Sequence, residues 1–245
     1  MGNINSRLII DVGMSEGHDS DFYLRKGFRV IGVEADPTVV SQLTERFKPE
    51  IEGGRLCIIN RAAWSQSGHS LTFWRNMAVQ GHSSLDRERG FGRKEPIKVD
   101  SVAWSELRTI AGTPYYLKMD IEGGEVAFLR SMAGSPEMPT YISTECHTFE
   151  PIGAMFELGY RKFKLVNQTI LHCFPMPDPP LEGDCVTSPD WAHASGAFGK
   201  ELPGHQWQDF QGITRQFDMI RQLREAGGVF QSWVWFDCHA RINDE

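Results

Sequence analysis

Leu8-Ile9-Ile10-Asp11-Val12-Gly13-Met14-Ser15-Glu16-Gly17 is the stretch that decides the fold of this 245-residue chain. An apolar strand runs directly into a glycine turn, and a second apolar strand ends on Glu34-Ala35-Asp36-Pro37. A strand, a glycine turn, a short helix and a strand ending in an acid are typical of a nucleotide-binding βαβ unit. The sequence therefore predicts a Rossmann-like α/β fold.

The residues of the turn favour one class of ligand. A dinucleotide turn of the GxGxxG type has three glycines, whereas this turn has Gly13 and Gly17 and carries Asp11 in the place of the first glycine. A carboxylate at that point repels a pyrophosphate but suits S-adenosylmethionine, which has a sulfonium, an amino group and no phosphate. The turn favours a methyl donor over NAD, and an NAD-dependent dehydrogenase is the alternative.

Strand and helix patterns alternate along the rest of the chain. They predict one domain over residues 1–245, with a doubly wound, seven-stranded and mostly parallel sheet. No helix pattern lies close between Arg161–Asn167 and Ser232–His239, so the last strand is expected to run antiparallel beside Thr140–Cys146. Residues 170–228 form an insertion between these last two strands. Because long loops in compact domains are usually lids or binding loops, we expect it to cover the substrate.

The composition excludes several classes of protein. A hydrophobic fraction of 40% supports one well-buried domain, and no apolar run reaches the ~18 residues of a membrane span. The net charge of −7 argues against a nucleic-acid partner. No secretory signal is visible, and the five cysteines are scattered without a CxxC motif, which predicts a cytoplasmic protein with reduced thiols. The number of subunits does not follow from the sequence.

Ligands of open parallel sheets bind beyond the carboxyl ends of the strands. This rule predicts a cofactor site from residues that follow four strands, namely Asp11, Gly13, Gly17, Glu34, Ala35, Asn60, Ala62 and Asp120, with Ser20 of the first helix beside them. Glu34 ends its strand where a carboxylate can accept hydrogen bonds from both ribose hydroxyls. A helix cap or a surface charge is the structural alternative for this acid.

Six motifs together resemble those of the FkbM-type methyltransferases. They are Asp11-Val12-Gly13-x-x-x-Gly17, Val33-Glu34-Ala35-Asp36-Pro37, Asn60-Arg61-Ala62-Ala63, Ser83-Ser84-Leu85, Lys118-Met119-Asp120-Ile121-Glu122-Gly123-Gly124-Glu125 and Thr144-Glu145. The resemblance covers about residues 7 to 147. It implies a class I S-adenosylmethionine-dependent enzyme, most often an O-methyltransferase of sugars and secondary metabolites. It further implies that Asp11, Gly13, Gly17, Glu34, Ala35, Ala62 and Asp120 hold the donor.

Four polar residues are candidates for the chemistry of transfer. A hydroxyl acceptor needs a proton acceptor within hydrogen-bond reach, or a metal that acidifies it. Asp120 and Glu122 lie two apart at one strand end, and Glu145 and His147 do so one strand over. His147 is our first choice as general base because its ordinary pKa lies near neutrality, with Glu145 and Glu122 as acceptor-binding catalytic residues. Alternatively, Asp120, Glu122 and Glu145 bind Mg²⁺, or Glu122 caps a helix and His147 binds a loop carbonyl.

The predicted function is methylation of a hydroxyl on a small-molecule acceptor, a sugar, glycan or natural product. N-methylation of a small molecule and a non-catalytic nucleotide-binding module are the alternatives. Short strands at Leu71–Trp74 and Pro96–Val99 bracket a basic loop, in which Arg75, Arg87, Arg89, Arg93 and Lys94 outnumber the acids. This loop is either a solvated surface or a recognition site for an anionic glycan through an arginine.

Overall fold

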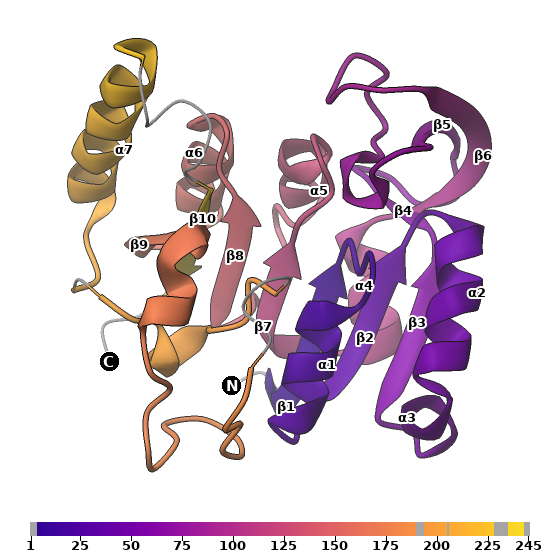
Figure 1. Cartoon of the computed structure of the whole chain (residues 1–245), viewed down its shortest axis with the longest axis horizontal. Coiled ribbons are helices and arrows are strands. Elements are labelled where there is room, and N and C mark those ends of the chain that lie inside the picture. Colours follow the sequence, from indigo (N-terminus) through magenta and orange to yellow (C-terminus); the bar gives the residue numbers. More distant parts are fainter. Residues whose placement is uncertain (1–3, 190–193, 205, 228–234, 243–245) are drawn as a thin grey trace.

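The computed structural model describes residues 4–189, 194–204, 206–227 and 235–242. Its main sheet has seven strands in the order β3-β2-β1-β7-β8-β10-β9 (Figure 1). The strands are β1 (Ile4–Val12), β2 (Arg29–Glu34), β3 (Leu56–Asn60), β7 (Thr113–Met119), β8 (Tyr141–Glu145), β9 (Lys162–Asn167) and β10 (Phe236–Arg241). The neighbours from β3 to β8 pair in parallel, and β10 pairs antiparallel with both β8 and β9. The predicted seven-stranded sheet with an antiparallel last strand is confirmed. The expected first residues of that strand, 232–234, lie outside the described part of the chain.

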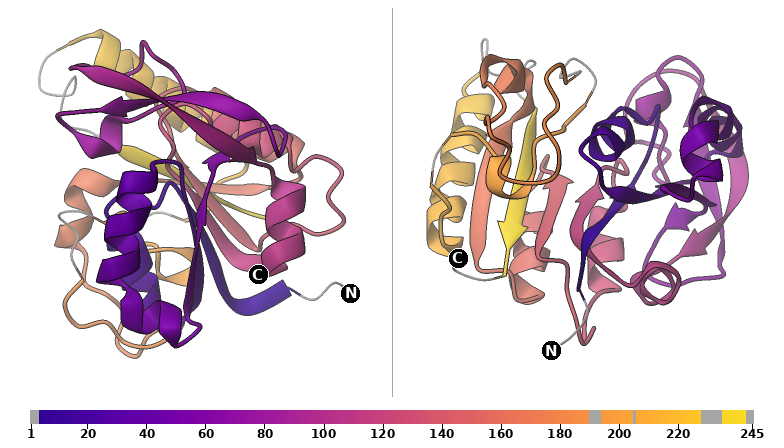
Figure 2. Two further views of the ribbon diagram at one scale, coloured as in Figure 1. Left: turned by 90° about the vertical axis from the view of Figure 1, so that its right-hand side faces the viewer. Right: turned by 90° about the horizontal axis from the view of Figure 1, so that it is seen from below.

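Helices cover both faces of this sheet, as the two views of Figure 2 show. On one face α1 (His18–Arg25) and α2 (Pro37–Arg46) contribute Phe22, Tyr23 and Leu43 to a buried cluster, and α3 (Lys48–Glu52) follows α2. On the other face lie α4 (Trp104–Ala111), α5 (Glu125–Arg130), α6 (Glu150–Glu157) and α7 (Phe210–Glu225), which pack into a second cluster. The fold is therefore doubly wound, as predicted.

A second, smaller sheet lies above the carboxyl ends of the first strands (Figure 1). It consists of β4 (Ala62–Ala63), β6 (Lys94–Val102) and β5 (Ser70–Asn76), with η1 (Gln80–His82) in the connection between β5 and β6. The two strands expected in this region are longer than the sequence suggested, because they pair in register from Ser70 with Asp100 to Asn76 with Lys94. The hairpin projects over the edge of the main sheet where the ligand site is expected.

The insertion between β9 and β10 packs in part against the main sheet. It contains η2 (Gln168–Cys173), η3 (Gly199–Glu201) and α7. Phe198 is buried and stacks on Tyr116 of β7, with ring centroids 4.8 Å apart and an interplanar angle of 6°. Glu201 pairs with the buried Lys26 at 2.7 Å. Phe198 and Glu201 thus attach the described part of this segment to the core beside α1, and its role as a cover of the substrate stays a prediction.

None of the helices in the described ranges combines the length and the apolarity that crossing a membrane requires.

Candidate functional site

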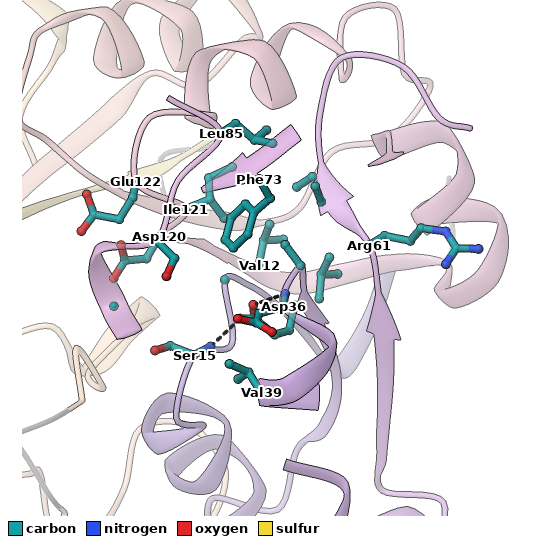
Figure 3. Close-up of a pocket in the computed structure, with 18 residues that line it drawn as sticks. Val12, Ser15, Asp36, Val39, Arg61, Phe73, Leu85, Asp120, Ile121 and Glu122 are labelled. Atoms are coloured by element: carbon teal, nitrogen blue, oxygen red, sulfur yellow. Dashed lines mark hydrogen bonds between the residues drawn. The ribbon is translucent and has the colours of Figure 1, made fainter. Parts of the chain in front are cut away.

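A pocket opens at the carboxyl ends of β1, β2 and β7, beneath the small sheet (Figure 3). Its lining combines backbone of the glycine turn, an acidic rim and an apolar wall, and consists of Val12, Gly13, Ser15, Val33, Glu34, Ala35, Asp36, Val39, Arg61, Ala62, Ala63, Phe73, Gly81, Ser83, Leu85, Asp120, Ile121 and Glu122. Five of the predicted cofactor-binding residues line it, namely Gly13, Glu34, Ala35, Ala62 and Asp120. Asp11, Gly17, Ser20 and Asn60 do not.

The glycine turn brings the ends of β1 and β7 together. Gly13 has φ +88°, and a Cβ placed on it would lie 1.8 Å from the carbonyl oxygen of Asp120. Its N–H donates to the carbonyl of Val33 at 2.9 Å. Gly17 has φ +80° and begins α1, and a Cβ there would lie 2.6 Å from the ring of Phe47. Gly13 thus shapes the cavity itself, whereas Gly17 allows α1 and α2 to pack behind it.

Glu34 is fixed at the rim by two backbone hydrogen bonds. One carboxylate oxygen accepts from the N–H of Ser15 at 2.9 Å and the other from the N–H of Asp36 at 2.8 Å, drawn as dashed lines in Figure 3. Burial raises the pKa of Glu34, against the effect of these two donors. Asn60 lies behind the rim, where its amide donates to the carbonyls of Glu34 and Ala35 at 2.9 and 3.0 Å. Asn60 therefore orients the backbone of the rim from outside the cavity.

Asp11 and Ser20 form a buried pair beneath the cavity. Ser20 lies inside α1, does not cap it, and donates its hydroxyl to Asp11 at 2.7 Å. Both residues are completely buried. Burial raises the pKa of Asp11 to about 7, while the ammonium of Lys118 acts in the opposite direction. The expected direct contact of Ser20 with a cofactor has no geometric support, since its hydroxyl is used by Asp11.

Lys118 is a residue whose role the sequence reasoning missed. Its ammonium lies 3.0 Å from a carboxylate oxygen of Asp19, 3.6 Å from one of Asp120 and 4.0 Å from one of Asp11. The signal in the sequence was a lysine two residues before the motif aspartate, on an otherwise apolar strand. A buried lysine requires anionic partners, so this spacing could have indicated a charge cluster.

The predicted catalytic residues Glu122, Glu145 and His147 come together at one end of the cavity. One ligand atom from each lies within 4.8 Å of the others. Glu145 and His147 pair at 2.8 Å, and this hydrogen bond raises the pKa of His147 above its ordinary value. Burial raises the pKa of Glu145. Glu122 has φ +55°, and its carbonyl accepts from the hydroxyl of Ser84 at 2.6 Å.

The geometry fits the Mg²⁺ alternative only in part. Asp120 is not in the group of mutually close ligand atoms, and His147 stands in its place. The carboxylate of Glu122 already pairs with Arg89 at 2.8 Å, so a guanidinium occupies the position of a neutralising cation.

The small sheet covers the cavity, and the cations of the basic loop contact other groups of the protein. Phe73 and Leu85 of this region face the cavity (Figure 3). The guanidinium of Arg75 pairs with Asp36, and that of Arg89 with Glu122. The other three cations of the loop also have partners: Arg93 pairs with Glu95, Lys94 binds the carbonyls of Arg87 and Arg89, and Arg87 lies over the ring of Trp74. Arg75 and Arg89 thus attach the small sheet to the acidic rim of the cavity, and recognition of an anionic acceptor by an arginine of this loop stays a prediction.

A seven-stranded sheet with an antiparallel β10, together with a cavity at the carboxyl ends of its first strands, defines a Rossmann-like methyltransferase architecture. Residues 11–173 match the family model described as the methyltransferase FkbM domain. This match spans more than half of the chain, and the chain belongs to that family. The resemblance drawn from the sequence motifs is confirmed.

Individual relatives are more distant. A probable ribosomal RNA small subunit methyltransferase A from Methanospirillum hungatei JF-1 is 37% identical over 57 residues, which are 23% of this chain and 22% of that protein. The chain therefore matches less than a quarter of the length of this curated relative. The crystal structure of a methyltransferase FkbM from Methylobacillus flagellatus KT is 17% identical and covers 68% of this chain and 41% of its own, with a TM-score of 0.46. A methyltransferase from Thiobacillus denitrificans in complex with S-adenosyl-L-homocysteine is 11% identical, covering 98% and 86%, with a TM-score of 0.41.

Proposed function

We propose that the cavity binds S-adenosylmethionine and that the chain transfers its methyl group to a hydroxyl of a small sugar, glycan or natural product. The observation that carries this proposal is the carboxylate of Glu34, held at the cavity rim by the N–H groups of Ser15 and Asp36. Each of its oxygens uses one lone pair on the backbone and keeps another. Glu34 lies at the end of β2, where the ligands of open parallel sheets bind. Two ribose hydroxyls can therefore donate hydrogen bonds to these oxygens.

The remaining lining is complementary to the other parts of the donor. Val39, Phe73 and Leu85 give an apolar wall of suitable character for an adenine ring. Asp120, whose side chain is 29% exposed, offers an anion to the amino and sulfonium groups. No phosphate-binding arrangement lines the cavity among the described residues, and the carboxylates of Glu34, Asp36 and Asp120 disfavour a pyrophosphate.

The pair of Glu145 and His147 beside the cavity suits a hydroxyl acceptor. The donor supplies an electrophilic methyl group on a sulfonium, and positioning of the acceptor accounts for most of the acceleration. Glu145 and His147 form a hydrogen-bonded pair that can receive the hydroxyl proton, with Glu145 stabilising the imidazolium that results. An amine acceptor loses its proton without such help, so this pair favours O-methylation over N-methylation.

Calorimetry with S-adenosylmethionine, S-adenosylhomocysteine and NAD⁺ tests the donor site. We expect the two sulfur compounds to bind and Glu34→Ala to weaken both at least tenfold, which is about 1.4 kcal/mol. Glu50→Ala, which removes an acid that pairs with Arg55 away from the cavity, is the matched control and leaves both affinities unchanged. Binding of NAD⁺ in place of the sulfur compounds would support the dehydrogenase alternative and refute the proposal.

The acceptor is tested separately with a panel of hydroxyl and amino compounds and methyl-labelled donor. Label on hydroxyl oxygens is the expected result, and label on nitrogen would refute O-methylation while leaving the donor site intact. Intact donor binding with no labelled product across such a panel would favour a non-catalytic binding module.

A further inference from the structure

Lys118, which does not itself line the cavity, lies at the centre of a buried charge cluster. Its side chain is 3% exposed, and carboxylates from three elements surround its ammonium: Asp11 of β1, Asp19 of α1 and Asp120 after β7. Burying a lysine is unfavourable unless its charge is compensated. Such a cluster is therefore expensive to maintain in a core that apolar residues could fill.

Asp120 is the member of the cluster that reaches the ligand site. Its side chain is 29% exposed and lines the cavity, whereas those of Asp11 and Asp19 are 1% and 11% exposed. Its backbone N–H donates to the carbonyl of Val12 at 2.9 Å, which fixes the start of the loop after β7. Lys118 thus contacts the one carboxylate of the cluster that a ligand in the cavity can also contact.

We propose that Lys118 is a positioning residue for the methyl donor, which holds the carboxylate of Asp120 at the cavity without touching the donor itself. This inference rests on the proposed function. Lys118 and Asp120 lie two residues apart at the end of β7, so their side chains project to the same side. The ammonium of Lys118 lies 3.0 Å from a carboxylate oxygen of Asp19 and 3.6 Å from one of Asp120. Because the contact with Asp19 is closer, Asp120 keeps enough negative charge to attract a cationic ligand.

The cluster also connects the insertion to the donor site. The N–H of Gly196 donates to the second carboxylate oxygen of Asp19 at 2.9 Å, so residues of the 170–228 segment hold the partner of Lys118 in place. The other titratable groups that interact with Lys118 are Asp237 and His239 of β10 and Tyr116 of β7, all of them buried. The insertion therefore acts on the donor from beneath the cavity, through Asp19 and Lys118.

Lys118→Met tests the proposal, because methionine keeps the length of the side chain and removes its charge. Lys26→Met is the matched control: Lys26 is an equally buried lysine, is paired with Glu201 and is not among the residues that line the cavity. Both variants are expected to lose stability, so stability is not the readout. We expect Lys118→Met to weaken binding of S-adenosylmethionine at least tenfold at both pH 6 and pH 8, since the carboxylate of Asp120 then loses the cation that positions it. Lys26→Met should keep the wild-type affinity within twofold at both pH values.

Asp19→Asn is the second variant, for use if Lys118→Met does not fold. The amide oxygen can still accept from Gly196, but the ammonium then turns to Asp120 and neutralises it. We expect the affinity for S-adenosylmethionine to fall relative to that for S-adenosylhomocysteine, which lacks the sulfonium charge. An unchanged ratio in Asp19→Asn, or wild-type affinity of Lys118→Met across the pH range, would overturn the proposal.

A donor-free measurement separates this proposal from the proposed function. The carboxyl carbon resonances of Asp11 and Asp120 can be followed by NMR in the free protein. Loss of the Lys118 charge should raise the pKa of Asp11 further and shift the Asp120 resonance, while Lys26→Met changes neither. If the wild type bound no donor, the proposed function would fail, and these resonances would still decide whether Lys118 controls Asp120. Identical resonances in the wild type and in Lys118→Met would refute that control.

Discussion

Arg75 of β5 forms a two-pronged ion pair with Asp36 at the end of β2, with N–O distances of 2.5 and 2.6 Å. The same guanidinium donates to the hydroxyl of Thr38 at 3.0 Å. Because Asp36 also caps α2 through the N–H of Thr38, this contact joins the small sheet to the rim of the cavity. The small sheet, which covers the candidate donor site, is thus anchored to Asp36, two residues after Glu34.

Arg75→Ala should loosen this cover and weaken S-adenosylmethionine binding about three- to tenfold, or ~1 kcal/mol. The reason is that Phe73, on the same strand, is held over the cavity by the strand that Arg75 anchors. Calorimetry measures the effect. Arg93→Ala is the control, because Arg93 pairs with Glu95 on the exposed side of the same hairpin. Equal affinities of the two variants would show that the Asp36 contact is irrelevant to the donor.

Gly13→Ala should destabilise the protein by more than ~3 kcal/mol, because its φ is +88° and the new Cβ would collide with the carbonyl of Asp120. Gly68 has φ +76° with nothing within 4 Å of its added Cβ, so Gly68→Ala should cost only about 1 kcal/mol. Urea denaturation of both variants separates steric collision from backbone strain. Similar losses in the two would contradict the close approach of β1 and β7.

Asp11 should make stability depend on pH. Its pKa in the folded protein is about 7, above the ordinary 3.8, so the folded state binds the proton more tightly than the unfolded state. The stabilisation from this proton is complete below pH ~4 and is lost as the pH rises toward ~7. The side chain of Asn in Asp11→Asn does not titrate, so this variant does not lose this stabilisation as the pH rises. The unfolding free energy of the wild type minus that of Asp11→Asn should therefore fall between pH 4.5 and 7 and then level off. A constant difference across this range would mean that Asp11 stays ionised in the folded protein.

His147 should titrate above its ordinary pKa of 6.5, because its ring donates to the carboxylate of Glu145. Glu145→Gln removes this charge and should move the ring titration to lower pH. NMR of the imidazole reports both values without any substrate, and the His172 ring, in the insertion, serves as an internal reference. If His147 acts as base, the acid limb of the rate profile moves in the same direction. A ring titration insensitive to Glu145→Gln would remove the pair from the mechanism.

Strand positions and the edge rule for parallel sheets were enough to place Gly13, Glu34 and Asp120 at one cavity. Apolar runs and glycines determine where strands end, and parallel strands end at a common edge. The same reasoning brought Glu122 together with Glu145 and His147. It could not separate residues that line the cavity from those that support it, as Asp11 and Asn60 show. Both lie at the correct strand ends, but their side chains turn inward to partners that are distant in sequence.

The contacts of the basic loop and of the insertion could not be predicted from the sequence. Charge counts indicated cations between Arg75 and Lys94, but the partners of Arg75 and Arg89 are Asp36 and Glu122, which lie tens of residues away. The length of the insertion predicted a substrate cover, but it did not indicate that Phe198 of this segment would be buried in the core. A pattern of residue types does not say which sheet face a long connection will cover.

The sequence by itself determined the family, the doubly wound sheet and the acids at its carboxyl edge, because periodicity and short motifs are local properties of the chain. Only the tertiary structure decided that the small sheet covers the cavity, that Arg89 pairs with Glu122 and that the ammonium of Lys118 lies among Asp11, Asp19 and Asp120. These relationships depend on the burial of charges by contacts between remote segments, and a charge finds its partner only when the chain has folded around it.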